Sequence, residues 1–396
     1  MINKPFWNIL CLIFLFAGST LHAQIVTFQR ILPGIDRNMV TVGCEPTEEG
    51  GFYLLNISED MSNSMLDSAL NISKHDPKGN VTWSVDYTIE GIAYLTDFRY
   101  MDIENIGADT LAVSGVMTQT NLANTEHFLF KIDPGNGDLL YSGLIKNDNE
   151  ILGPSFFTKV LRDSEDKINY FGSHVDSDST VWVHMEKMGR SFIRDTSKSV
   201  AAVDMSGNLL PTGFWDATTL MDSTLAMSVA IIDSNELKRT GLVVIDSSTN
   251  VRWAASYSIQ NPLYDLLQVF GIAETADTGF VFTGNYLELL GPSQVSYVFK
   301  TDSVGNVEWA YDFNDVEIGT LSFLNDVLVT EKNEILLTGK SVNAFNGDLA
   351  DFGIYLDNDG NVIRQVQYNS VNSFFLDIAS GLTVLAGDTK NSSDGT

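Results

Sequence analysis

The residues with the most capacity for chemistry lie in one short segment, GSHVDSDSTVWVH. It places His174, Asp176, Asp178 and His184 around a predicted loop between two strands. Imidazole nitrogens and carboxylate oxygens are ligands for divalent cations, and alternation along an extended chain sends such side chains to one face. The segment therefore predicts a divalent metal site. The alternative is a purely structural acidic loop, as is common on the surface of an acidic protein.

A second candidate is the segment DNDGN at residues 357–361, which imitates the start of a calcium-binding loop. The loop lacks the glutamate that such sites place at position twelve, because Ser370 falls there when counting from Asp359. We therefore predict that the protein holds no cofactor, and the alternative is that this loop binds calcium.

The sequence contains no GxSxG, HExxH, phosphate-binding glycine loop or dinucleotide fingerprint, so we predict no catalytic residues. Cys44 has no histidine near it in sequence and is expected to be a small buried residue.

The DNDGN segment also belongs to a recurring frame, with relatives in KHDPKGNVTW, KIDPGNGDLLY, VIDSSTNVRW and KTDSVGNVEW. We interpret the frame as a hairpin turn in which the aspartate caps the turn, the glycine takes a positive φ and the asparagine supports the bend. An aromatic ring follows seven or eight residues after most of the aspartates and is expected to cover a seam between repeats. The predicted turn residues are Asp76, Gly79, Asp133, Asp246, Asp302, Gly305, Asp357 and Gly360.

A second marker recurs in step with the turns: a short apolar strand that ends in a small or turn-forming residue. The marker residues stand at positions 56, 115, 172, 229, 284, 339 and 387, at intervals of 59, 57, 57, 55, 55 and 48. A steady interval near 56 residues with alternating apolar and polar positions indicates a repeat of four strands. This period matches the blade of a β-propeller, so we predict an all-β, seven-bladed β-propeller.

The ends of the chain are predicted to close the ring. IVTFQR, at residues 25–30, matches the outermost strand of later repeats, and SFFLDIASGLTVLAG supplies two inner strands ending at Gly387. We therefore expect a seventh blade that is closed by the N-terminal strand and incomplete at the C-terminus, in a truncated chain. The register of the third repeat stays open, because its turn can be placed at Glu186 in HMEKMGRSFI or at Asp204 in AVDMSGNLLP.

The composition limits the cellular compartment and the classes of binding partner that we expect. Residues 1–23 have the basic, apolar and small-residue regions of a secretory signal peptide, which leaves residues 24–396 as the propeller domain. No other stretch approaches the roughly 20 apolar residues of a membrane span, so we expect no transmembrane segment. The formal charge of −28, from 51 acidic and 23 basic residues, opposes nucleic-acid binding. We expect a secreted or cell-surface monomer.

The Ala-Gln end of the signal, the opening TFQR, strands such as TGFVFTG and turns such as KTDSVGNVEWAY together resemble the secreted bacterial β-propeller repeat proteins. Members of that group often carry a C-terminal sorting domain for type IX secretion. The resemblance implies export to the cell surface or medium and implies no catalytic residues that could be carried over.

The leading functional hypothesis is a non-catalytic binding or adhesion module that recognises a protein or glycan through the variable loops between the second and third strands. The alternatives are a propeller enzyme acting on polysaccharide, either a hydrolase or a lyase, and a structural spacer within a larger surface protein. An enzyme would need several convergent acids, with a His, Tyr or Arg, at the mouth of the central channel.

Overall fold

The computed structural model shows an all-β protein. The chain divides into two compact units, residues 1–32 and 33–396, and every residue described here belongs to the second. None of the described part of the chain forms a helix that is long and apolar enough to span a membrane. The described residues are 37–60, 68–87, 92–95, 101–107, 109–119, 125–145, 158–163, 167–175, 181–192, 194–200, 210–232, 238–248, 250–258, 264–288, 294–312, 321–342, 349–368, 377–379 and 384–386.

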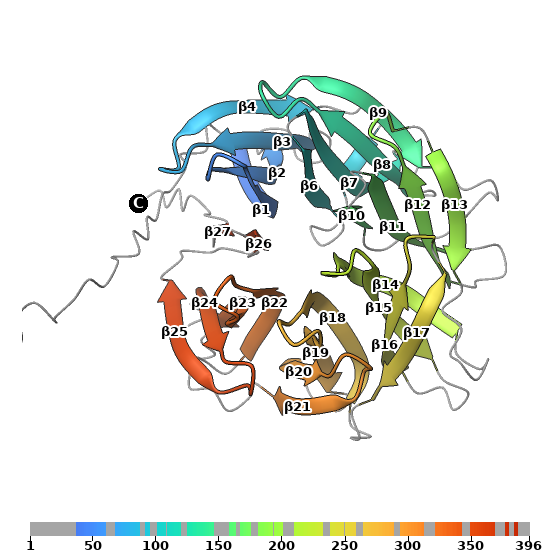
Figure 1. Ribbon diagram of the computed structural model, residues 1–396. Helices are drawn as coiled ribbons and strands as arrows, with labels where there is room; N and C mark the ends of the chain where they lie inside the picture. The colour runs from blue at the N-terminus through green and yellow to red at the C-terminus, as the bar shows by residue number, and fades with distance from the viewer. Residues whose placement is uncertain are drawn as a thin grey trace, which may run out of the picture. The chain divides into compact units, whose positions relative to one another are not determined.

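The strands form successive antiparallel sheets arranged around a ring (Figure 1). The first blade is β1 (Arg37–Pro46), β2 (Phe52–Asp60), β3 (Ser68–His75) and β4 (Val81–Tyr87). The second is β5 (Ile92–Leu95), β6 (Asp102–Gly107), β7 (Thr110–Gln119), β8 (Thr125–Ile132) and β9 (Leu139–Ile145), with β5 and β6 both pairing with β7. The third is β10 (Thr158–Arg162), β11 (Ile168–Val175), β12 (Val181–Met188) and β13 (Arg194–Val200).

The remaining blades repeat the same order from the innermost to the outermost strand. The fourth is β14 (Leu210–Thr219), β15 (Leu225–Ile232), β16 (Lys238–Ile245) and β17 (Val251–Tyr257). The fifth is β18 (Tyr264–Glu274), β19 (Phe280–Glu288), β20 (Gln294–Thr301) and β21 (Val307–Asp312). The sixth is β22 (Leu321–Val329), β23 (Ile335–Val342), β24 (Leu349–Leu356) and β25 (Val362–Tyr368).

The propeller predicted from the sequence is confirmed, with six complete blades in the described part of the chain. A seventh sheet contains β26 (Asp377–Ala379) and β27 (Val384–Ala386), the two inner strands expected before Gly387. Strand β26 contacts β22 of the sixth blade and β1 of the first, so this small sheet lies where the ring closes. The predicted closing strand at residues 25–30 lies outside the described residues.

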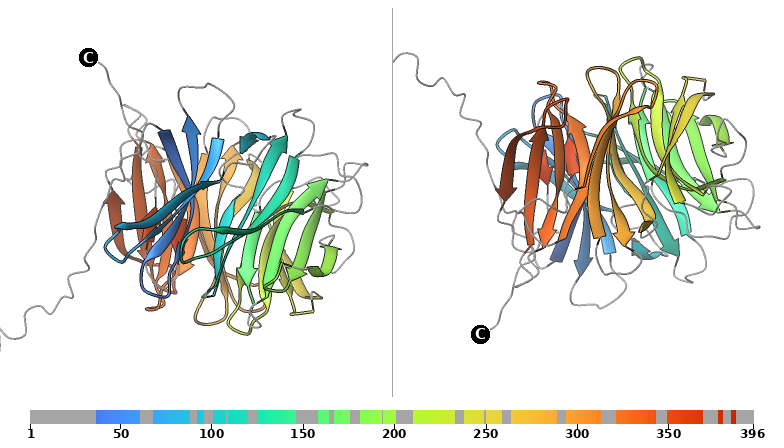
Figure 2. Two further views of the ribbon diagram at one scale, coloured as in Figure 1. Left: turned by 90° about the horizontal axis from the view of Figure 1, so that it is seen from above. Right: turned by 90° about the horizontal axis from the view of Figure 1, so that it is seen from below.

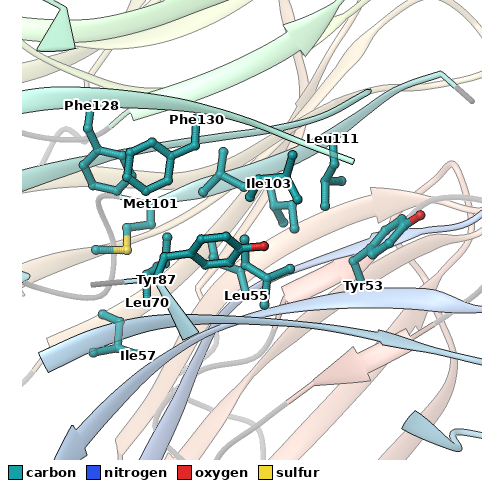
Figure 3. Close-up of a cluster of buried hydrophobic side chains, with 13 residues drawn as sticks. Tyr53, Leu55, Ile57, Leu70, Tyr87, Met101, Ile103, Leu111, Phe128 and Phe130 are labelled. Carbon is teal, nitrogen blue, oxygen red and sulfur yellow. The ribbon is translucent and has the colours of Figure 1, made fainter. Parts of the chain in front are cut away.

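The hydrophobic core is divided among the seams between blades. Each of the five principal clusters of buried side chains draws residues from two consecutive blades. At the first seam, Leu55 and Leu70 of the first blade pack against Ile103, Phe128 and Phe130 of the second (Figure 3). Because one face of each sheet packs on the next sheet, burial of apolar surface holds neighbouring blades together.

The Asp-x-x-Gly-Asn frame forms the turns between the third and fourth strands. At Asp302 the carboxylate accepts the backbone N–H groups of Val304 and Asn306 at 3.0 and 2.8 Å, while Gly305 has φ +87°. Hydrogen bonds from Asn306 are the main cause that lowers the pKa of Asp302. Similar bonds are made by Asp76 and Asp357, and Gly79 and Gly360 also have positive φ. Asp246 caps its turn in the same way without a following glycine, and Asp133 accepts the N–H of Gly135.

Aromatic rings of the outermost strands β4, β9, β17 and β21 lie on the corresponding turn of the next blade. The indole N–H groups of Trp83 and Trp309 donate to the carbonyl oxygens of Pro134 and Asn358, at 3.2 and 2.9 Å. A Cβ built on Gly360 would lie 2.6 Å from Tyr311. The turn glycine therefore supplies both the positive φ and the space for the neighbouring blade's rings.

The marker glycines do not end their strands, contrary to the prediction. Gly115 and Gly339 lie inside β7 and β23 and do not have positive φ. A Cβ on Gly115 would lie 2.5 Å from Phe128, and one on Gly339 would lie 2.2 Å from the carbonyl oxygen of Phe323. Close packing by neighbouring strands, not backbone conformation, explains the small residue at this position.

The third blade adopts the first of its two possible registers. Strands β12 and β13 are joined by the turn at residues 189–192, directly after HMEKM, where Phe192 N–H donates to Gly189 O at 2.9 Å. Glu186 itself lies within β12 and is buried. Asp204 lies outside the described residues.

The turn glycine provides the first test of this packing. We expect Gly360→Ala to lower the free energy of unfolding by about 2 kcal/mol or more, because a Cβ at positive φ is strained and meets Tyr311. Gly353→Ala is the matched control in β24, where the nearest atom would lie 3.4 Å away. Urea denaturation of both variants measures the difference. Equal losses in the two variants would contradict the packing described.

Candidate functional site

The predicted metal-binding residues are only partly placed by the structure. His184 in β12 is buried, and its Nε2 lies 2.9 Å from Oε1 of Glu186. The backbone of His174 in β11 pairs with that of Trp182, and the backbone of Gly172 pairs with that of His184. Asp176 and Asp178 lie outside the described residues. No group of three potential ligands gathers within the described ranges, and the four-residue metal site stays a prediction.

His184 belongs to a buried polar network that links the second and third blades. Glu186 is directly opposite Tyr170 in the β11–β12 ladder, and the Tyr170 hydroxyl contacts Nδ1 of His127 from β8. Burial is the main cause, and the charge of the nearby Glu186 the second, that raises the pKa of Tyr170 well above its usual value. The phenol therefore stays protonated. A Cβ on Gly172 would lie 2.6 Å from the His127 ring, so the glycine makes room for this network.

The innermost strands carry the second concentration of polar groups. An innermost strand pairs with its blade on one side only, so backbone groups on its other edge need partners. At all five junctions between consecutive blades, a side chain of the preceding blade accepts an N–H from the next innermost strand. The donor and acceptor pairs are Asn105 with Glu45, Val160 with Asp102, Arg162 with Glu104, Phe214 with Ser173, Ile272 with Asp216, and Leu324 with Ser296.

Three of these blades share a charged cluster on their innermost strands. Nζ of Lys159 in β10 lies 3.4 Å from Asp102 in β6 and 3.6 Å from Asp216 in β14. The lysine side chain is 30% exposed, whereas each aspartate side chain is 13% exposed. One partly accessible cation thus bridges two nearly buried anions on its two neighbouring blades.

Glu104 differs from the other acids of the cluster in its protonation. Burial, and then the charge of Asp102 two residues earlier, raise its pKa to about 8, against the lowering effect of Lys159 and Arg162. At neutral pH Glu104 therefore stays protonated beside the Asp102 carboxyl, which contacts Lys159. Such a pair is the combination that general acid and base chemistry uses. Both carboxyls, however, accept backbone N–H groups of β10, and Asp102 also contacts Lys159.

Lys300 is a second buried titratable group, and it too is paired. Its side chain is fully buried, with Nζ 2.8 Å from Asp277 and in contact with Glu308. Burial opposes the ionisation of Asp277, but hydrogen bonds from Lys300, Thr275 and Asn358 outweigh this effect and lower the aspartate's pKa. Because Asn358 belongs to the sixth blade, this group also links two blades.

The inner cluster was not predicted from the sequence. Asp102, Glu104 and Asp216 stand in the segments DIENIG and TGFWDATT, which carry no motif. A usable signal exists in several repeats, where an acid stands among apolar residues in the strand before the marker strand, as Asp216 does in TGFWDATT and Asp326 does in LSFLNDVLV. The predicted recognition loops between second and third strands lie mostly outside the described residues.

Comparison with known proteins supports the fold. No protein-family model matches the chain, and no curated protein sequence matches it. Among solved structures, an ulvan lyase described as a new family of polysaccharide lyase is similar with a TM-score of 0.59 and 9% identity, over 88% of this chain and 89% of that one. The α-L-arabinofuranosidase of Fusarium graminearum is similar with a TM-score of 0.52 and 11% identity, over 81% and 93%.

A third similar structure is PorZ of Porphyromonas gingivalis, described as a surface component of the type IX secretion system. It has a TM-score of 0.48 and 12% identity, over 89% of this chain and 45% of that one. At these identities, the likeness to the ulvan lyase and the arabinofuranosidase concerns the fold alone.

The raised pKa of Glu104 predicts a pH dependence of stability. The folded protein keeps the Glu104 proton up to about pH 8, whereas an unfolded glutamate loses it near pH 4.3. Since the folded state binds more protons between these values, its stability should fall as pH rises from about 4.5 to 8.

Glu104→Gln should remove this component, because the amide oxygen can still accept the Arg162 N–H without ionising. Thermal unfolding of wild type and variant across this pH range measures the effect, with Glu331→Gln, in an exposed turn, as the control. A Glu104→Gln profile parallel to that of wild type would contradict the raised pKa.

Proposed function

We propose that the protein is a secreted or cell-surface binding propeller that recognises a polysaccharide without cleaving it. Recognition takes place through the loops between the second and third strands of the blades. The observation that carries this proposal is the commitment of the inner acids to structure, since Asp102, Glu104 and Asp216 each accept a backbone N–H from the next blade.

Catalysis would draw on acids that can exchange protons with a substrate. A general acid or base must reach the reacting atoms within hydrogen-bond distance. In the described inner strands the carboxyl oxygens instead face backbone groups and Lys159. This use of the acids favours a binding role over a hydrolytic one.

The choice of ligand class rests on the fold. The ulvan lyase and the arabinofuranosidase, which share this architecture, are named for action on carbohydrates. Connections in an antiparallel meander alternate between its two ends, so the second strand of each blade ends and the third begins on the face opposite the repeated Asp-Gly turns. The strands run across the thickness of the ring between these two faces (Figure 2). A rigid ring with one face of repeated turns and one of diverse loops suits recognition by the latter.

A specific observation favours one alternative, a propeller enzyme acting on polysaccharide. Burial raises the pKa of Glu104, so it stays protonated at neutral pH beside the Asp102 carboxyl, and glycoside-cleaving enzymes use a protonated acid together with a second carboxyl group. In such an enzyme the side chain of Lys159, which is partly exposed, would contact the substrate.

One experiment separates the two functions. The purified protein is screened on a glycan array, and the polysaccharides that bind are then incubated with it and assayed for new reducing ends and for the unsaturated products of lyases. We expect binding to one class of polysaccharide with no product above the level of a boiled control. Binding to no glycan would contradict the proposal, and product formation that Glu104→Gln abolishes would establish the enzymatic alternative instead.

A further inference from the structure

The outermost strand of the second blade, β9, is an open edge of a distinctive kind. The sheet order runs β5-β7-β8-β9 and ends there, so one side of β9 has no paired strand within the described residues. Edge strands present backbone donors and acceptors that can pair with another chain. Proteins commonly protect such edges with charged side chains.

Five of the six described outermost strands carry that protection in their sequence. Strand β4 contains Asp86, β17 contains Arg252 and β25 contains Arg364. Strand β21 contains two acids and β13 contains three charged residues. Strand β9, with the sequence LLYSGLI, contains none.

The side chains of β9 are also unusually apolar for an exposed strand. Leu139 and Leu140 are 45% and 52% exposed, and Tyr141 and Leu144 are each 41% exposed. Strands β4, β17, β21 and β25 contribute one or two large exposed hydrophobic residues each, such as Val307 and Tyr311 in β21. The absence of charge and the exposed apolar side chains thus coincide on one strand, which lies on the perimeter of the ring (Figure 1).

We propose that β9 is a self-association edge, at which β9 of a second copy of this chain pairs antiparallel with it. An antiparallel pair of identical strands is related by a two-fold axis, so the same edge satisfies both copies and the contact closes as a dimer. The charge of the protein indicates where on its surface two copies can meet. Two chains of formal charge −28 repel each other, and β9 is the described outermost strand where no charge enters the contact.

This pairing has a distinctive dependence on salt. The contact is apolar and made by backbone hydrogen bonds, while the opposing force is repulsion between the two acidic bodies. Added salt screens that repulsion and leaves the edge contact intact. The dimer should therefore strengthen as the salt concentration rises. The monomer expected from the sequence alone would show no such change.

Sedimentation velocity over a series of protein concentrations, at low and at high salt, tests the proposal. We expect a monomer–dimer equilibrium whose dissociation constant falls at high salt. Leu140→Lys should raise that constant at least tenfold by placing a charge in the contact. Val307→Lys is the matched control on β21, since both side chains are 52% exposed, and it should leave the equilibrium near that of wild type.

Hydrogen exchange on the wild-type protein tests the same edge without depending on a variant that could misfold. The amides of residues 139–145 should gain protection as the wild-type protein is concentrated, while those of β21 should not. A wild-type protein that stays monomeric at every concentration and salt level would overturn the proposal. It would also be overturned by equal weakening in the two lysine variants, or by open-ended polymers in place of dimers.

Discussion

The open edge of each innermost strand is the constraint on which the rest of the structure depends. A propeller blade leaves the inner side of its first strand without a pairing strand, and its buried backbone groups still need partners. Here the preceding blade supplies them, through carboxylates at three of the five junctions and a hydroxyl at the other two. The blades are therefore joined by directional bonds near the axis as well as by apolar seams.

The perimeter has its own link between neighbours. Rings of one blade cover the turn of the next, as Trp309 does at Asn358, and the turn glycine leaves the space that they occupy. Apolar packing fills the region between these inner and outer links. The same residue frame thus recurs because each copy serves two blades at once, its own through the hairpin and the preceding one through the seam.

Much of this architecture could be predicted from the sequence, because hairpin turns and strand alternation depend on nearby residues. The turn at Asp302–Asn306 and the covering ring of Trp309 follow from local spacing. The role of the marker glycines could not be derived in this way, since Gly115 is small because of Phe128 on the neighbouring strand. The inner cluster was missed for a related reason. Lys159 joins Asp102 and Asp216, and the 57 residues on each side of it in the sequence give no local sign of that meeting.

The same constraint shapes the functional conclusion. Acids near the axis of a propeller invite a catalytic interpretation, and the protonated Glu104 beside Asp102 strengthens it. Their hydrogen bonds to β10 assign them first to holding blades together. A protein whose inner acids hydrogen-bond to the next blade has a rigid ring that is suited to presenting loops, which is the proposed role.

The most direct test of the central claim is amide hydrogen exchange at Val160 and Ile272, whose N–H groups donate to Asp102 and Asp216. If side chains of the preceding blade satisfy the inner edges, these amides should exchange as slowly as amides paired within the sheets. Exchange at the rate of an unprotected amide would contradict the account.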